Sequence, residues 1–238
     1  MNDDLREIYE RLAYCDEEFQ QLSGQVRSFF KQHKEVRAFA MPAELGVQMR
    51  LTAAPPGSFK LKAGGIVHEA RSCLDALAVR LAARNGKNSK GVYFPISKSA
   101  DIFADDGRQK IRKLTPEHQQ KIIDIRPFPP DNAFLFGMHE FDRIRKHVRL
   151  NATFAGAGGM VLYSGENVGV ISTHRVELTP DWQLVAVFTR STVAKVDFIA
   201  QITLSEPPEL DGDDLITSVQ RFNAEVRRIA DLFREGSP

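Results

Sequence analysis

Two long amphipathic segments, one near each end of the chain, most constrain how it can fold. In residues 3–33 and again in residues 211–235, apolar side chains recur at alternating intervals of three and four residues. The first series is Leu5, Ile8, Leu12, Cys15, Phe19, Leu22, Val26 and Phe29, and the second is Leu215, Val219, Phe222, Val226, Ile229 and Phe233. This spacing gives an α-helix one apolar face that other elements must cover.

Both helices are therefore expected to pack on central helices of the same bundle. Tyr9 and Phe30 widen the first stripe beyond the narrow seam of a coiled-coil dimer, which favours packing within the chain. Periodicity alone does not separate that arrangement from a homodimer, so a homodimer stays open.

The residues between these two helices predict further helices and then strands. Residues 36–53 have β character, residues 59–85 predict a second long helix, and VYFPI at 92–96 predicts a buried extended segment. Helix-start signals follow at Thr115-Pro116 and again at Asp131 or Asn132. Strand-like stretches fill much of residues 151–205, and Asp211 or Asp213 begins the last helix.

The predicted fold class is therefore α+β: a helical bundle of about five helices with a small antiparallel β-sheet in the C-terminal half. We expect one domain over residues 1–238. Its parts are a mainly helical core (1–150), antiparallel strands (151–205) and a C-terminal helix that packs back on the bundle (211–235).

Charge and composition exclude several classes of protein. The net charge is +1, so no global field draws the chain toward nucleic acid or anionic lipid, and any basic site must be local. The acidic start MNDDLREIYERL is not a signal peptide, and no apolar run approaches the roughly 20 residues of a membrane span. Cys15 and Cys73 show neither CxxC nor zinc spacing and are expected to be buried thiols. These features predict a soluble, cytoplasmic protein without a cofactor.

Groups suited to proton and phosphate chemistry gather on two of the predicted helices. The first carries His68, Arg71, Ser72 and Asp75, with His68, Arg71 and Asp75 in one narrow stripe. The second carries His139, Arg143, Lys146, His147 and Arg149. Histidine can act as a general acid or base near neutral pH, and arginine and lysine bind phosphate. If the helices face each other, these groups would share one cleft.

Within that cleft we assign candidate catalytic and binding roles. The candidate catalytic residues are His68, Arg71, Asp75, Arg143 and His147, and the candidate binding residues are Ser72, His139, Lys146 and Arg149. The competing interpretation is a structural hydrogen-bond cluster on a largely buried helix, where polar groups need partners. A metal site is disfavoured because neighbouring Arg and Lys would repel a cation. Solvent exposure discriminates between a functional site and a structural cluster: the side chains of a site line an open cleft, whereas those of a structural cluster are sealed from solvent.

Several of these motifs resemble an uncharacterised family of bacterial and phage-associated proteins. That family carries a VHNLRSALDHLA helix, an FPI segment and a helix ending in IDKHRRL, followed by strands. The matching residues here are Val67-His68, Arg71-Ser72, Leu74-Asp75, Leu77-Ala78, Phe94-Pro95-Ile96, Lys146-His147 and Arg149-Leu150. The resemblance covers roughly residues 60–150 and implies no particular activity.

A weaker resemblance is to the HEPN superfamily of helical bundles, which often dimerise and include metal-independent RNases. Their active site carries an Arg and a His about four to six residues apart on one helix. Arg71 is present here, but Ala76 stands five residues later. This resemblance implies binding of RNA or another phosphate-containing ligand, or metal-independent RNA cleavage. The alternative from the residues themselves is a non-catalytic binding or assembly module in which the polar cluster is structural.

Overall fold

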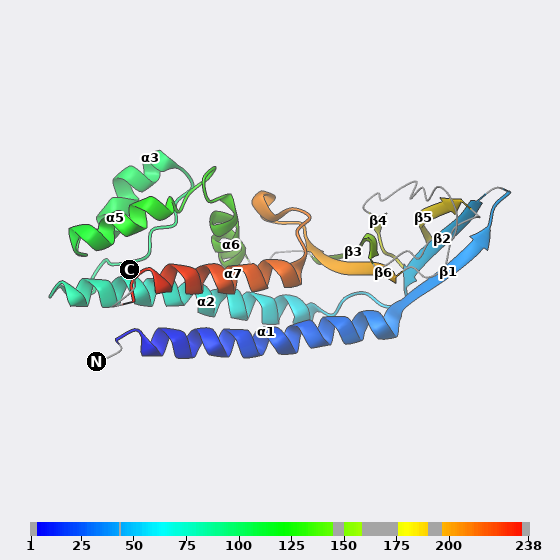
Figure 1. Cartoon of the computed structure of the whole chain (residues 1–238), viewed down its shortest axis with the longest axis horizontal. Coiled ribbons are helices and arrows are strands. Elements are labelled where there is room, and N and C mark those ends of the chain that lie inside the picture. Colours follow the sequence, from blue (N-terminus) through cyan, green and yellow to red (C-terminus); the bar gives the residue numbers. More distant parts are fainter. Residues whose placement is uncertain (1–3, 43, 145–149, 159–175, 190–196, 235–238) are drawn as a thin grey trace.

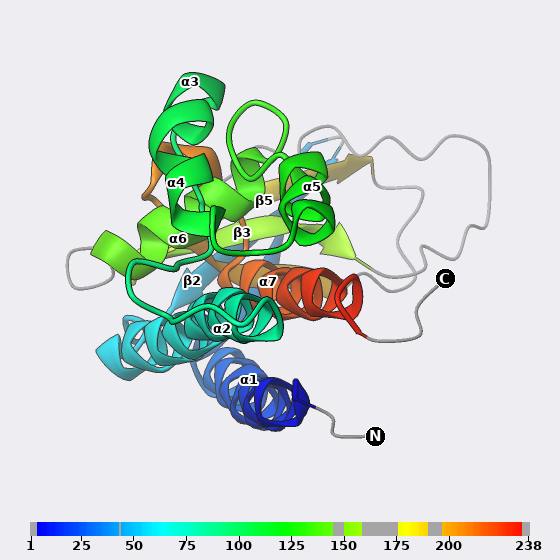
Figure 2. The same cartoon turned by 90° about the vertical axis from the view of Figure 1, so that its left-hand side faces the viewer.

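The apolar stripes form three long helices that lie along one another. In the computed structural model these are α1 (Arg6–His33), α2 (Gly57–Arg84) and α7 (Leu215–Asp231). They run together along the long axis of the molecule (Figure 1), and the end-on view shows them grouped as a bundle (Figure 2). The structure describes residues 4–42, 44–144, 150–158, 176–189 and 197–234.

The stripe of α1 is covered from within the chain. All eight residues of its three-four series are buried, and α1 packs on α2 and α7. The prediction that this stripe faces the core is therefore confirmed. Helix α2 is the central element, because it is buried around much of its circumference by contacts with α1, α7 and α6.

A second group of helices covers α2 and α7. It consists of α3 (Ala100–Ile102), the π-helical turn η1 (Phe103–Gly107), α4 (Arg108–Ile111), α5 (Pro116–Ile125) and α6 (Ala133–Ile144). The Thr115 side chain caps α5 by accepting from the His118 backbone N–H, and Asn132 accepts from the Leu135 N–H at the start of α6. The sequence predicted α5 and α6 but not the α3–η1–α4 segment, which begins at a Ser99 cap.

The strands form two three-stranded antiparallel sheets within the described residues. The first, in the order β1-β2-β5, joins β1 (Lys34–Ala40) and β2 (Glu44–Leu51) to β5 (Gln183–Thr189). The second, in the order β4-β3-β6, joins β4 (Val176–Glu177), β3 (Leu150–Gly158) and β6 (Asp197–Leu204). The α+β class is thus confirmed. The predicted small antiparallel sheet of the C-terminal half is confirmed as β4-β3-β6, and the structure adds a second sheet in which β5 pairs with β2.

One glycine makes the β1–β2 ribbon possible. Gly46 lies opposite Phe39 in the register, and an added Cβ at Gly46 would overlap the Phe39 ring. Any larger residue would displace that aromatic ring. Beside the ribbon, Arg37 and Arg50 place their guanidinium carbons 4.1 and 4.6 Å from the Trp182 ring centroid.

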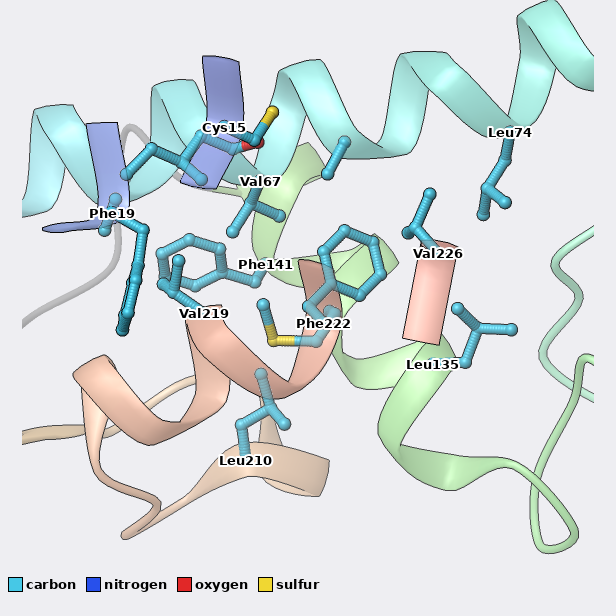
Figure 3. Close-up of a cluster of buried hydrophobic side chains, with 14 of the residues drawn as sticks. Cys15, Phe19, Val67, Leu74, Leu135, Phe141, Leu210, Val219, Phe222 and Val226 are labelled. Atoms are coloured by element: carbon cyan, nitrogen blue, oxygen red, sulfur yellow. The ribbon is translucent and has the colours of Figure 1, made fainter. Parts of the chain in front are cut away.

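The core continues from the three-helix bundle into α6. Phe141 of α6 and Phe222 of α7 lie among Val67 and Leu74 of α2 (Figure 3). The 3₁₀ turn η2 (Pro208–Leu210) packs on α6 at Gly137, where an added Cβ would be 3.0 Å from Leu210 Cγ. Helix α6 also packs on α2, and His139 of α6 contacts Arg71 of α2.

Candidate functional site

The candidate site lies where the polar stripe of α2 meets α6. His68 contacts Asp142 and Arg71 contacts His139, so the contacts step forward along α2 and backward along α6. The two helices therefore pass each other in opposite directions. The prediction that these two helices face one another holds for the described part of α6.

Arg71 is the centre of this cluster. Its side chain is only 11% exposed, yet three elements share its guanidinium. Nη1 lies 2.7 Å from Asp75 Oδ1, Nη2 donates to the Phe94 carbonyl at 3.0 Å, and Nε donates to His139 Nδ1 at 3.3 Å. A planar guanidinium suits this task because its donors diverge in a fixed plane.

Asp75 and Arg71 together satisfy the backbone of Phe94. Asp75 Oδ1 accepts from the Phe94 N–H at 2.9 Å, while Arg71 donates to the carbonyl of the same residue. Phe94 is 1% exposed and lies in a segment without regular secondary structure, with Pro95 next in the chain. Buried backbone groups need partners, and here two helix side chains supply what a neighbouring strand would supply in a sheet.

His139 is held in its neutral form. Burial, and then the positive charge of Arg71, lower the pKa of His139 below its ordinary value. A neutral imidazole has one nitrogen lone pair, and His139 Nδ1 uses it to accept from Arg71. The proton of the neutral ring is therefore on Nε2.

His68 differs from its neighbours because it is accessible. Its side chain is 53% exposed, and its Nδ1 lies 3.1 Å from Asp142 Oδ1, whose side chain is 17% exposed. A carboxylate at this distance orients the ring. This pair is the part of the cluster that solvent reaches.

The structure does not bring every candidate residue into the cluster. Arg143 is 65% exposed and donates to Glu140 of its own helix, with a 3.0 Å bond from Nε to Oε2. That contact raises the pKa of Arg143. Ser72 is half-buried on α2. Lys146, His147 and Arg149 lie outside the described residues.

Two partners in the cluster were missing from the predicted site. Asp142 lies three residues after His139, a spacing that puts both on one helix face, so its role could have been found. The Phe94 backbone could not, because side-chain patterns carry no signal for which distant main chain needs partners.

Metal-ligating residues do not gather in the part of the chain that the structure describes: no group of three or more His, Cys, Asp or Glu is placed to hold an ion there. Among the same residues, no helix combines the length and apolar character needed to cross a bilayer. The chain matches no known family model, no curated protein and no solved structure. The family resemblances above therefore remain predictions.

Proposed function

We propose that this chain is a non-catalytic binding or assembly module, and that the cluster around Arg71 is a structural lock. The lock joins α2, the Phe94 segment and α6. One observation carries the proposal: the Arg71 guanidinium is almost fully buried, its Nη2 and Nε donate to Phe94 and His139, and its Nη1 lies within ion-pair distance of Asp75 without an aligned hydrogen bond.

This arrangement matters because a phosphate-binding arginine must reach its ligand. Arginine binds phosphate through N–H groups that point at the ligand, usually two at once. In the lock, Nη2 and Nε donate to a carbonyl and an imidazole of the protein, and Nη1 is buried beside the Asp75 carboxylate. His139, neutral and bonded to Arg71, is likewise occupied on one nitrogen. Neither group is arranged to stabilise charge on a bound phosphoryl group.

The alternative is metal-independent RNA cleavage, and one observation favours it. His68 is exposed and paired with Asp142, so it is placed to exchange protons with a ligand. In that case His68 and His147 would share proton transfers, and the RNA would supply its own 2′-hydroxyl as nucleophile.

Incubating the purified full chain with labelled single-stranded RNA in EDTA separates the two proposals. The variants are His68→Asn, His147→Asn and the structural variant Arg71→Lys, each accompanied by a melting curve. A binding module predicts no cleavage by any of them and a lowered melting temperature for Arg71→Lys alone. Cleavage by the wild type that either histidine variant abolishes, at unchanged melting temperature, would overturn the structural proposal.

A further inference from the structure

A basic pocket lies between residues 90–93 and 106–113. Its volume is about 280 Å³, and the residues that carry the argument are Lys90, Tyr93, Asp106, Lys110, Arg112 and Lys113. This size is at the small end of sites for organic ligands. None of these residues belongs to the predicted cluster on α2 and α6.

Positive charge is concentrated around this pocket. Residues 87–113 contain seven Lys or Arg and three Asp, a local excess of four, whereas the whole chain carries a net charge of +1. Only Lys110 among the lining cations has an ion pair with a described residue, at 2.6 Å to Asp106. Lys90, Arg112 and Lys113 have no carboxylate within ion-pair distance in the described part of the chain. The pocket therefore presents uncompensated positive charge.

Lys113 is held in place by neutral oxygens. Its ammonium donates to Asn88 Oδ1 at 2.5 Å, the Lys90 carbonyl at 2.6 Å and the Asn88 carbonyl at 3.4 Å. These contacts fix the position of the charge without neutralising it. They also use the three N–H donors of the ammonium, so Lys113 contributes positive charge to the pocket and no hydrogen bond to a ligand.

Tyr93 places an aromatic ring beside these cations. Its side chain is 54% exposed, whereas Val92 and Phe94 on either side are 2% and 1% exposed. Buried neighbours on both sides anchor the backbone, so the ring is held at the surface between them. An exposed aromatic ring next to Arg and Lys is the arrangement that stacks a nucleobase while the cations bind phosphate.

Complementing the dipole of a nearby helix does not account for all of these cations. Basic residues at a helix C-terminus complement the helix dipole, but α4 has only four residues, and Lys90 lies on a separate loop. The pocket is also bordered by the π-helical turn η1, a feature often found at functional sites.

We propose that this pocket binds a nucleoside phosphate, with Arg112 and Lys90 on the phosphates, the fixed charge of Lys113 nearby, and the Tyr93 ring against the base. The inference rests on the proposed binding function and gives it a ligand class. The ligand proposal and the lock can be tested separately. RNA cleavage and melting temperature test the lock, whereas ligand affinity tests the pocket.

Isothermal titration calorimetry of the full chain in EDTA tests this, with ADP, adenosine and inorganic phosphate as separate probes. We expect ADP to bind with a Kd below about 1 mM. Arg112→Gln should weaken ADP binding by about 10-fold or more, and Tyr93→Leu by about 5-fold or more. Because both side chains are at the surface, the melting temperature should stay unchanged.

Arg108→Gln is the matched control. It removes the same charge from an exposed residue four positions from Arg112 that does not line the pocket, so ADP affinity should change by less than about 2-fold. No measurable ADP binding, or an equal loss in the Arg108 and Arg112 variants, overturns the site. Equal affinity for ADP and inorganic phosphate, unaffected by Tyr93→Leu, overturns the role of the base.

Discussion

Replacing Arg71 should destabilise the fold, whereas replacing Arg143 should not. Both arginines face ion-pair partners and both were candidate catalytic residues, but their surroundings differ. Arg71 is 11% exposed and bonds to three elements, while Arg143 is 65% exposed and bonds only within α6 to Glu140 among the described residues. The pair therefore compares a buried lock with a surface contact of similar chemistry.

The expected size of the Arg71→Ala effect follows from what it leaves behind. His139 Nδ1 loses its donor, and a buried acceptor left without one costs about 1–3 kcal/mol, whereas the Phe94 carbonyl keeps the Ile96 backbone N–H at 3.1 Å. Asp75 loses its cation, but its side chain is 35% exposed, so water replaces part of that interaction. We expect a loss of about 3 kcal/mol, at the low end of the range for a broken buried pair. In a chain of this size that corresponds to a fall of about 6–12 °C in melting temperature.

Circular dichroism melting curves of three variants measure this. Arg71→Ala should show the full loss, and Asp75→Asn a smaller one, because its amide oxygen can still accept from the Phe94 N–H. Arg143→Ala should stay within about 0.5 kcal/mol of the wild type. If the Arg71 and Arg143 variants melt within about 2 °C of each other, the lock does not exist as described.

Three further predictions concern other parts of the structure. Burial and the neighbouring arginine lower the pKa of His139, so the unfolded chain binds more protons and the free energy of unfolding should fall as the pH drops below about 6.5. Urea titrations should show a weaker pH dependence of this free energy for His139→Gln than for the wild type, and an equal dependence in the two proteins would contradict this. Burial raises the pKa of Cys15 to about 12 and of Cys73 to about 11, so neither thiol should react with a disulfide reagent at pH 8 until urea unfolds the chain; rapid labelling of the native protein would refute it. Gly137→Ala places a Cβ 2.9 Å from a side-chain carbon of η2 and should destabilise the protein by about 1–3 kcal/mol. Gly65→Ala meets open space in mid-helix and should stabilise it by about 0.5–1 kcal/mol. Chemical denaturation measures both effects, and effects of the same sign would contradict the packing described.

The long helices were predictable because their signal is periodic and local. The apolar stripes placed α1 and α7 within a few residues of their observed bounds, and Thr115-Pro116 marked the start of α5. The α3–η1–α4 segment gave a weaker signal, since each piece has five residues or fewer and cannot show a helical repeat. The pairing of β2 with β5 was unpredictable for another reason: it joins strands more than 130 residues apart, and strand pattern does not name a partner.

The sequence predicted the position of the candidate site better than the role of each residue in it. The stripe spacing correctly indicated that His68, Arg71 and Asp75 share a helix face, and the same reasoning placed His139 on the opposing helix. It could not distinguish Arg71 from Arg143, because burial depends on what packs above each helix. That covering segment, residues 92–96, looked like a short apolar stretch with no chemical role.

The covering segment also links the lock to the basic pocket. Arg71 and Asp75 hold both polar backbone groups of Phe94, and the next residue back along the chain is Tyr93, which lines the pocket. A variant that weakens the lock should therefore disturb the Tyr93 ring without touching a ligand. Loss of ADP binding in an Arg71 variant would not mark Arg71 as a ligand contact, since its melting temperature would fall as well. Only variants that lose affinity at unchanged melting temperature, as expected for Arg112→Gln, identify the residues that bind.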